Sequence, residues 1–265
     1  GNVLGVMLIA ASFGLGLAFM PKTENREVLL KGILGFQELF FTLIKALLAI
    51  LPVGILAFAG QLSAQIEAGV IVGALGKYTL VIMASNGIQF FLVLPLFLLA
   101  RGLNPIDVFK KMSPAIAVAL FTKSSAGTLP VTLASAEKNL KANPAVSRFV
   151  LPICTTINMN GCAAFILITS LFVMQNAGIE LSMTTMLTWL IVAVLAAVGN
   201  AGVPMGCYFL TLSLMSGIGA PIGIMGLILP IYTIIDMIET AENVWSDSCV
   251  CAMTDHDLKG KLNQE

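Results

Sequence analysis

The sequence predicts an all-α membrane protein that is built from transmembrane helices and two re-entrant helical hairpins. Hydrophobic residues make up 58% of the 265 residues and charged residues only 11%, whereas soluble domains carry about 25% charged residues. Polar breaks that contain Gly, Asn or Pro interrupt several apolar segments. Irregular backbone persists at membrane depth only where protein or a water-filled cavity surrounds it. The cations gather at one set of segment ends, as expected for the cytoplasmic side.

Residues 1–103 are predicted to form three transmembrane helices. About 20 apolar residues are needed to span a bilayer, and this region holds apolar segments over 1–21, 32–60 and 70–100. The charged stretch 22–31 separates the first two segments. Glu38 and Lys45 interrupt the second segment, and Pro52 is expected to bend or end its helix.

A re-entrant hairpin is predicted over residues 104–142, at the start of a transport core that covers 104–257. Basic residues flank its apolar segment on both sides: Lys110, Lys111, Lys138, Lys141 and Arg148. Because basic flanks mark the cytoplasmic side, both ends of this segment are expected there, and the chain must turn back inside the membrane. The polar stretch Lys123–Pro130 (KSSAGTLP) supplies the turn.

The rest of the core is predicted to form a broken helix, a second re-entrant hairpin, a last helix and a cytoplasmic tail, over 146–177, 182–219, 221–254 and 255–265. Asn158–Gly161 (NMNG) breaks the first of these helices. Gly199–Pro204 (GNAGVP) interrupts the second hairpin, which is too long for one span and too short for two. Hairpins that enter from opposite faces beside a broken helix are the sequence pattern of a secondary transporter.

Acidic residues in the last helix mark the candidate site. The chain carries no charged residue from Leu181 to Ile235, and then four carboxylates follow closely. On a helix, one stripe collects Asp236, Thr240, Asn243 and Asp247. Glu239 borders this stripe, whereas Glu242 lies outside it and could equally pack against another helix or the lipid interface. An intramembrane carboxylate costs about 2.5–3.5 kcal/mol and usually faces a cavity or a partner, so the stripe is predicted to face a binding site.

Three backbone breaks could surround this stripe, at 124–127, 158–160 and 200–204. Their carbonyl, amide and hydroxyl oxygens suit a small cation such as Na⁺, and free N–H groups at helix starts suit a substrate carboxylate. Asp236 suits a substrate ammonium group. Together these groups would hold an amino acid and a cation. Lys45 and Lys77 either snorkel to the membrane surface or line a functional path.

Other classes of function have little support in the sequence. No basic patch with interleaved aromatic residues predicts nucleic-acid binding. The cysteines show neither a disulfide framework nor zinc-ligand spacing, so they are expected to be buried thiols: Cys154, Cys162, Cys207, Cys249 and Cys251. An aspartic protease needs carboxylates about 3 Å apart, but Asp236 and Asp247 lie about 16 Å apart along a helix. Adjacent Lys123 and Ser124 do not face each other on a helix, which argues against a hydrolase. His256, in the polar tail, is expected to be solvated, and no enzymatic activity is expected.

Four stretches of this chain, in order, resemble motifs of the dicarboxylate/amino acid:cation symporter family, which contains the glutamate transporters. They are Thr122–Pro130 (TKSSAGTLP), Thr156–Gly161 (TINMNG), Ala201–Pro204 (AGVP) and Asp236–Asp247. The likeness covers nearly the whole chain. It implies a glutamate-transporter-like fold, a homotrimer in the full-length form, and about three further transmembrane helices before this segment, which would then be an N-terminally truncated chain.

The resemblance also implies roles for individual residues. Substrate contacts are expected from Ser124, Ser125, Met159, Gly202, Val203, Asp236, Glu239, Thr240 and Asn243, with Asp236 holding the amino group. Sodium ligands are expected from Asn158, Asn243 and Asp247 at one site, and from Thr156 with carbonyls near 197–200 at another. Asn160 stands at a further cation ligand position, where the family usually has Asp. The second hairpin would be the gate.

Glu239 stands where the glutamate and aspartate carriers have an arginine. Two like charges 4 Å apart repel by about 4 kcal/mol at an effective dielectric constant of 20, so an acidic substrate is disfavoured. The pattern then resembles the sodium/serine-threonine symporters. We expect sodium-coupled symport of a small neutral amino acid, such as serine, threonine or alanine, by an elevator-type movement. The expected location is the lipid bilayer of a bacterial inner membrane, with a cytoplasmic C-terminus.

Two alternatives stay open on the sequence alone. The chain could belong to a carrier of acidic or cationic amino acids or dicarboxylates with proton coupling, in which Glu239 titrates or meets a cationic side chain. It could also be a fragment that does not transport.

Overall fold

The computed structural model describes residues 3–36, 38–39, 42–43, 53, 72–200 and 202–259. All regular elements in these ranges are helices, which confirms the predicted all-α class. Three helical stretches are long and apolar enough to cross a membrane: Leu75–Ala100, Pro144–Asn176 and Gly223–Leu258. The chain divides into two compact units, residues 1–70 and 71–265, and each is described by itself.

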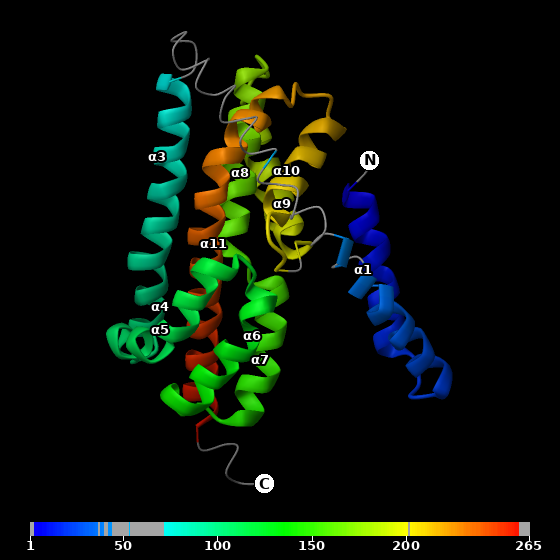
Figure 1. The fold of residues 1–265 in the computed structure, drawn as a ribbon, viewed down its shortest axis with the longest axis vertical. Helices are drawn as coiled ribbons and strands as arrows, with labels where there is room; N and C mark the ends of the chain where they lie inside the picture. Colours follow the sequence, from blue (N-terminus) through cyan, green and yellow to red (C-terminus); the bar gives the residue numbers. More distant parts are fainter. Residues whose placement is uncertain are drawn as a thin grey trace. The chain divides into compact units, whose positions relative to one another are not determined.

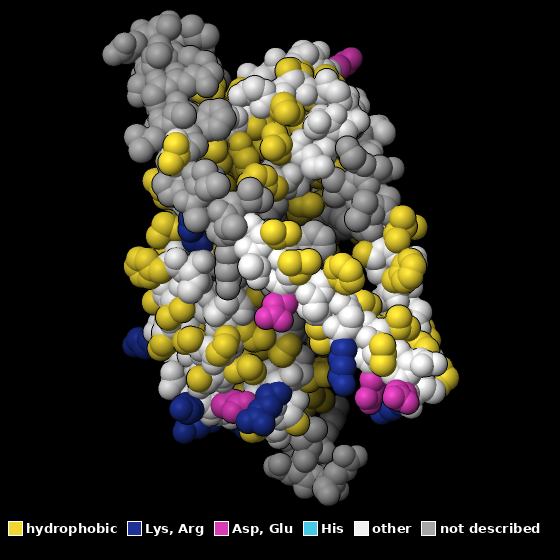
Figure 2. All heavy atoms as spheres, turned by 45° about the vertical axis from the view of Figure 1, so that its right-hand side comes forward, with side chains coloured by type: hydrophobic (Ala, Val, Ile, Leu, Met, Phe, Trp, Pro, Cys, Tyr) yellow, Lys and Arg dark blue, Asp and Glu magenta, His cyan; other side chains and the backbone are white. Residues whose placement is uncertain are grey.

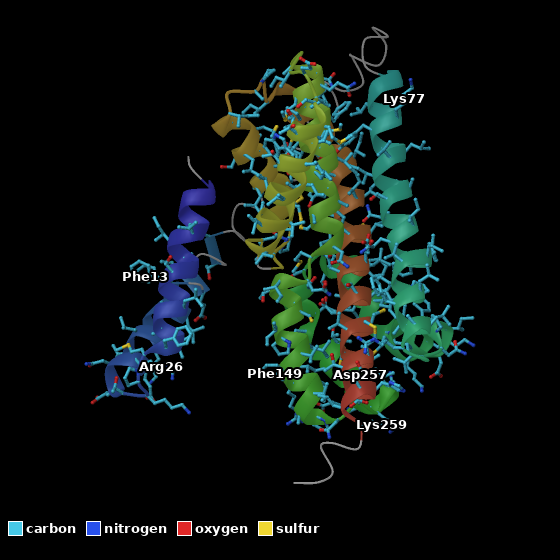
Figure 3. All side chains as sticks on the ribbon, turned by 180° about the vertical axis from the view of Figure 1, so that it is seen from behind. Phe13, Arg26, Lys77, Phe149, Asp257 and Lys259 are labelled. Atoms are coloured by element: carbon cyan, nitrogen blue, oxygen red, sulfur yellow. A yellow bond between two sulfur atoms is a disulfide. The ribbon has the colours of Figure 1, made fainter. Side chains whose placement is uncertain are left out.

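In the first unit, helix α1 covers Val3–Phe19 and a second helix is described over 24–36. The charged stretch expected to separate two spans therefore starts a helix instead. The Arg26 Nε donates to the Leu17 carbonyl at 3.0 Å and so ties the turn to α1. Leu8 and Phe13 are 72% and 74% exposed, as suits a lipid-facing helix (Figure 3). Most of the second predicted span, 32–60, lies outside the described residues.

The second unit begins at residue 71. The last helix of residues 1–103, a region predicted to hold the rest of the scaffold and the start of the transport domain, belongs to this unit. This helix consists of α3 (Val72–Ile88), a π-helical turn η1 (Gln89–Val93) and α4 (Leu94–Ala100). It stays with the core because the Trp245 Nε1 donates to the Phe90 carbonyl at 3.2 Å and both rings pack with Phe109.

The first hairpin consists of α5 (Pro105–Thr122), α6 (Ser125–Ser135) and a π-helical turn η2 (Ala136–Leu140). Asn104 caps α5, since its side chain accepts from the Ile106 N–H at 2.9 Å. Lys123 has a φ of 52° and turns the chain at the tip. The Ser124 Oγ then accepts from the Gly127 N–H at 3.0 Å and starts α6.

The broken helix and the second hairpin follow. Helix α7 (Pro144–Ile157) ends at Asn158, and α8 (Asn160–Asn176) starts after Met159. The second hairpin consists of α9 (Met183–Val198) and α10 (Gly206–Gly217). In Figure 1, α5 and α6 lie toward the end of the unit that holds the C-terminus, whereas α9 and α10 lie toward the other end. The two hairpins therefore enter the unit from opposite sides.

Helix α11 (Gly223–Leu258) passes along the whole second unit and forms its centre. It runs four residues past the end expected at 254. The Asp255 carboxylate accepts from the Asn143 backbone N–H at 2.7 Å, and Asp257 pairs with Arg101. These contacts hold the final turn of α11 against the hairpin end of the unit, so part of the predicted tail is helical.

The surface and interior of the second unit reverse the pattern of a soluble protein. Large apolar side chains such as Phe91, Phe121 and Phe149 are 77%, 78% and 69% exposed. Buried polar residues gather instead on α11, where Asp236, Glu239, Glu242 and Asp247 are all under 5% exposed. Figure 2 shows a broad hydrophobic face, with most of its charged side chains near one end. Apolar surface outside and carboxylates inside indicate a membrane protein with an internal polar site.

Candidate functional site

A closed polar cavity lies where the two hairpin tips and the helix break meet the middle of α11. Its lining is Lys123, Ser125, Met159, Cys162, Asn200, Gly202, Val203, Cys207, Asp236, Glu239, Thr240 and Asn243. Every predicted substrate residue except Ser124 is in this set. The remaining free space is about 10 Å³, roughly what one water molecule requires. An amino acid could therefore enter only if one of the tips moved.

The tips of the two hairpins bind each other directly. The Ser124 Oγ donates to the Gly202 carbonyl at 2.8 Å, and the Ala126 N–H donates to the same oxygen at 3.4 Å. Ser124 is thus a tip-to-tip contact next to the cavity. The Gly202 carbonyl occupies donors at the start of α6, where a ligand carboxylate would otherwise be bound. Opening the tips would release these donors to a ligand.

Gly202 permits this close approach. Its φ is +66°, a conformation in which side chains are strained. A Cβ atom at this position would lie 2.8 Å from the Thr155 carbonyl oxygen, 3.2 Å from the Ala126 nitrogen and 3.2 Å from the Met159 Cε. The second hairpin tip consequently contacts both the first tip and the end of α7 through bare backbone.

Asp236 and Glu239 face the cavity from adjacent turns of α11. Asp236 accepts from the Met205 N–H at 3.3 Å and from the Tyr232 hydroxyl at 3.3 Å. The Tyr232 hydroxyl also lies 3.4 Å from the Glu239 Oε2. The Glu239 Oε1 has no hydrogen-bond partner among the described residues. Two buried acids with few donors form a site that favours a positively charged group.

A second polar cluster joins the break between α7 and α8 to the C-terminal half of α11. The Asn158 Nδ2 donates to the Asp247 Oδ1 at 2.9 Å and to the Ser246 Oγ at 2.9 Å. The Asn160 Nδ2 donates to the same Ser246 oxygen at 2.8 Å. The Asn243 Oδ1 accepts from the Gly161 N–H at 2.9 Å and joins this cluster to the cavity.

This cluster fits a sodium ion in its chemistry. The hydrogen bonds of Asn158 and Asn160 use their nitrogen atoms, so the amide oxygens remain available, together with the second oxygen of Asp247. Oxygen donors with one carboxylate are the ligands that coupling cations take at broken helices. Asn158, Asn160, Asn243 and Asp247 would hold such an ion, and the ion would supply positive charge beside the ligand cavity.

Thr156 does not join either cluster. It is exposed, and its hydroxyl donates to the Ile153 carbonyl of its own helix at 2.8 Å. Among the described residues, no hydrogen bond joins it to 197–200, where a second sodium site was expected. Its side chain lies on the exposed face of α7, whereas the neighbouring Thr155 is buried. The role of Thr156 stays a prediction.

Three contributions were not foreseen from the sequence. Tyr232 and Ser246 lie on α11 beside the expected acids, and their hydroxyl groups were the only local feature that could have indicated a role in the site. The third is a disulfide between Cys162 and Cys207, whose Cα atoms are 5.6 Å apart. The expectation that all cysteines are buried thiols was wrong for this pair, because 45 residues separate the two and only the fold brings them together. The other three cysteines are free and buried.

Glu242 lies outside the cavity, as its helix position indicated. It is 1% exposed, and neither of its carboxylate oxygens has a hydrogen-bond partner among the described residues. Lys77 projects at the outer end of α3 (Figure 3) and is exposed. The His256 side chain is 47% exposed, which confirms the expectation that it is solvated.

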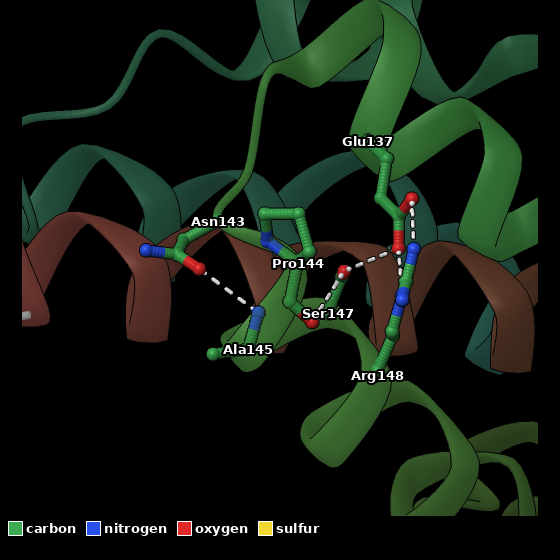
Figure 4. Close-up of polar contacts among 6 residues, drawn as sticks. All are labelled: Glu137, Asn143, Pro144, Ala145, Ser147 and Arg148. Carbon is green, nitrogen blue, oxygen red and sulfur yellow. Dashed lines mark hydrogen bonds and ion pairs between the residues drawn. The ribbon is translucent and has the colours of Figure 1, made fainter.

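A surface network of hydrogen bonds and an ion pair holds the end of the first hairpin to the start of α7. The Arg148 guanidinium donates to both oxygens of Glu137, at 2.8 and 3.2 Å, and the Ser147 hydroxyl donates to one of them at 3.3 Å (Figure 4). These donors hold the pKa of the Glu137 carboxyl below its usual value, with the Arg148 hydrogen bond as the main cause. Asn143 caps the start of α7 beside this network.

Two opposed helical hairpins and a broken helix, arranged around a buried polar site, define the architecture of a helical secondary transporter. The chain belongs to the sodium:dicarboxylate symporter family, whose sequence pattern matches residues 1–257. This confirms the resemblance seen in the motifs.

Among curated relatives, the chain is similar to excitatory amino acid transporter 1 of Homo sapiens, with 31% identity over 98% of this chain. It is also similar to excitatory amino acid transporter 3 of Mus musculus, with 30% identity over 99% of this chain. It covers 48% and 50% of these two relatives, so the chain spans about half the length of the curated relatives it matches.

Proposed function

We propose that the full-length protein is a sodium-coupled symporter of a small neutral amino acid, and a carrier rather than an enzyme. Membership of the sodium:dicarboxylate symporter family supports coupling to sodium, and the named relatives support an amino acid as substrate. The choice of a neutral substrate rests on one observation. Glu239 places a second carboxylate in the cavity next to Asp236, and its Oε1 has no hydrogen-bond partner among the described residues.

The cavity offers complementary groups for the two ends of an amino acid. The Asp236 carboxylate would bind the ammonium group. The N–H groups at the start of α6, near Ser125 and Ala126, would bind the carboxylate once the Gly202 carbonyl leaves them. Glu239 would then lie at the ligand side chain, where an acidic group would be repelled by about 4 kcal/mol at a separation of 4 Å and an effective dielectric constant of 20.

The remaining space limits the size of the ligand. Asn200, Val203 and Met159 fill the cavity around the acids, which favours a short side chain such as that of serine, threonine or alanine. Thr240 lies on the same face of α11 as Asp236, but its hydroxyl donates to the Asp236 carbonyl at 2.7 Å. The lone pairs of this hydroxyl remain available to accept a hydrogen bond from a ligand.

Movement of the second hairpin would admit the ligand. Among the described residues, its tip is bonded to the first hairpin through the carbonyl of Gly202. We propose that this hairpin is the gate and that the second unit moves as an elevator in the full-length protein. A homotrimer, a bacterial inner membrane and a cytoplasmic C-terminus complete the proposal. The cytoplasmic C-terminus is favoured by Arg101, which pairs with Asp257 near the end of α11, and by the further cations of the predicted cytoplasmic segments, Lys110, Lys111 and Arg148.

The test is the thermal stability of the full-length protein in detergent, with serine, aspartate and lysine titrated in sodium and in choline. A ligand at 100 times its Kd adds about 2.7 kcal/mol if it binds only the folded state. We expect serine to stabilise the protein only in sodium. Stabilisation of the wild type by aspartate would contradict the argument from Glu239. In the variant Glu239→Gln, the discrimination against aspartate should weaken while serine still binds.

A second candidate is a carrier of cationic amino acids. The unpartnered Glu239 Oε1 favours it, since a ligand ammonium or guanidinium group could bind there. Stabilisation by lysine but not by serine, lost in Glu239→Gln, would select this candidate.

A further inference from the structure

The wall of the cavity contains a sulfur pair that joins two separate elements. Cys162 lies in the first turn of α8, and Cys207 lies at the start of α10 in the second hairpin. Their Cα atoms are 5.6 Å apart, inside the range of 4.4–6.8 Å that a disulfide requires. They are 1% and 3% exposed, and both line the cavity. No local sequence pattern brings them together, so the packing of α10 on α8 creates the pair.

Polar groups of the site surround the two sulfur atoms. The Asn200 Nδ2 donates to the Cys162 Sγ at 3.0 Å and lies 3.5 Å from the Cys207 Sγ. A Glu239 carboxylate oxygen and both sulfur atoms all lie within 4.8 Å of one another. The pair therefore sits beside Glu239, where the ligand side chain is placed by the proposed function.

We propose that Cys162 and Cys207 are a reversible redox modification site, and that their disulfide fixes the second hairpin to α8 and keeps the ligand cavity closed. Besides this bond, the described residues of the hairpin tip contact the first hairpin through the Gly202 carbonyl and α11 through the Met205 N–H, which donates to Asp236. A disulfide limits the two Cα atoms to a separation of about 7 Å or less. With both cysteines reduced, the start of α10 is free to leave α8 and the tip can open.

The reaction requires a small disulfide compound as oxidant. The thiolate of one cysteine attacks the oxidant, forms a mixed disulfide and releases one thiol. The second cysteine then attacks the mixed disulfide, so the Cys162–Cys207 bond forms and a second thiol leaves. In total, two protein thiols lose two electrons and two protons, and the oxidant takes them up as two thiols. A dithiol reductant reverses both steps.

Peptide mapping of the full-length protein tests the bond itself. After alkylation of the unfolded chain without reductant, we expect one linked peptide pair that contains Cys162 and Cys207, and alkylated Cys154, Cys249 and Cys251. Alkylation of both Cys162 and Cys207 in protein treated with the oxidant would overturn the proposal. Their protection by a metal ion, released by a chelator, would also overturn it and would indicate a thiolate–carboxylate metal site with Glu239 instead.

Hydrogen exchange tests, without any ligand, whether the disulfide locks the second hairpin to α8; this restraint is called the lock below. We expect the amides of 206–217 to exchange at least about tenfold more slowly in the oxidised protein than in the reduced protein, because local opening controls their exchange. The double variant Cys162→Ala/Cys207→Ala should exchange quickly under both conditions, and the control Cys251→Ala should behave like the wild type. Equal exchange in oxidised and reduced wild type would overturn the lock.

The effect of the disulfide on ligand entry rests on the proposed function. The stability assay separates a failure of the lock from a failure of the proposed substrate. We expect serine in sodium to stabilise the reduced wild type but not the oxidised wild type. Equal stabilisation of both forms would show that the disulfide does not keep the cavity closed. Stabilisation of neither form would contradict the proposed substrate, and the exchange experiment would still test whether the disulfide fixes the hairpin.

Discussion

Replacing Gly202 by alanine should separate the two hairpin tips and destabilise the second unit. The new Cβ atom would lie 2.8 Å from the Thr155 carbonyl oxygen and 3.2 Å from the Ala126 nitrogen. Both are backbone atoms, so neither can move aside cheaply. The φ of +66° adds a second cost, since alanine is strained in this conformation.

The two costs can be separated by a matched control. Gly219 has a φ of +74°, but a Cβ atom there would meet nothing within 4 Å. Gly219→Ala should therefore show only the conformational penalty, about 1–2 kcal/mol. Gly202→Ala should add an overpacking penalty of typically 1–3 kcal/mol, which gives a total of about 2–5 kcal/mol.

The assay is unfolding of both variants in the same detergent, together with hydrogen exchange at the Ala126 amide. We expect a larger loss of stability in Gly202→Ala and faster exchange at Ala126, because its bond to the Gly202 carbonyl would break. Equal destabilisation of the two variants would refute the idea that close contact of the tips requires glycine at 202.

Three further predictions concern the ion cluster, the surface network and the core. Asp247→Asn should abolish the sodium-dependent part of the ligand response, measured by stability in sodium and in choline, and a full response in this variant would exclude Asp247 from the ion site. Because the pKa of Glu137 is lowered in the folded state, its pair with Arg148 should contribute stability above the unfolded-state pKa of about 4.3 and lose it as the pH falls through the folded-state pKa. Glu137→Gln should flatten this part of a stability–pH curve, and an unchanged curve would contradict it. Trp245→Ala, at a 1% exposed position, should cost about 3–5 kcal/mol in unfolding experiments, whereas the 77% exposed Phe91 should cost under about 0.5 kcal/mol when replaced by alanine. Similar losses for both aromatic residues would refute the assignment of Trp245 to the core.

The contact between the two hairpin tips involves the same N–H groups that the proposed ligand would use. The Gly202 carbonyl takes the donors at the start of α6 that a ligand carboxylate would need. In the proposed function, a ligand would compete with the hairpin for the same N–H groups. Opening would cost the hydrogen bonds of Gly202 and binding would restore equivalent bonds, so entry of the ligand would be coupled to movement of the hairpin.

Much of the fold could be read from local sequence features. Hydropathy located the helices, and Gly199–Pro204 lies between α9 and α10 as predicted. The other two breaks are shorter than predicted, since only 123–124 and 158–159 lie between helices, whereas 125–130 and 160–161 are helical. Helical periodicity placed Asp236, Thr240 and Asn243 on one face, and these residues line the cavity. Such features are local, since the period of a helix and the apolar length of a span are fixed by a few turns of chain.

The predicted ends of helices were less reliable where contacts between residues far apart in the sequence determine them. Helix α11 extends to Leu258 because Asp255 and Asp257 bind groups from other elements. The packing of Phe90 on Trp245 likewise joins the helix before residue 103 to α11. In each of these contacts the two residues lie more than 100 positions apart in the sequence, so no local pattern could indicate the contact.

The sequence by itself determined a helical membrane chain with two re-entrant hairpins and a stripe of acids on the last helix, because hydropathy and helical period act over neighbouring residues. Only the tertiary structure decided that Ser246 joins Asn158 and Asn160, that Gly202 closes the first hairpin tip, and that Cys162 meets Cys207. These contacts join residues that are 45 to 88 positions apart. They depend on how whole helices pack, and a pattern along the chain does not contain that information.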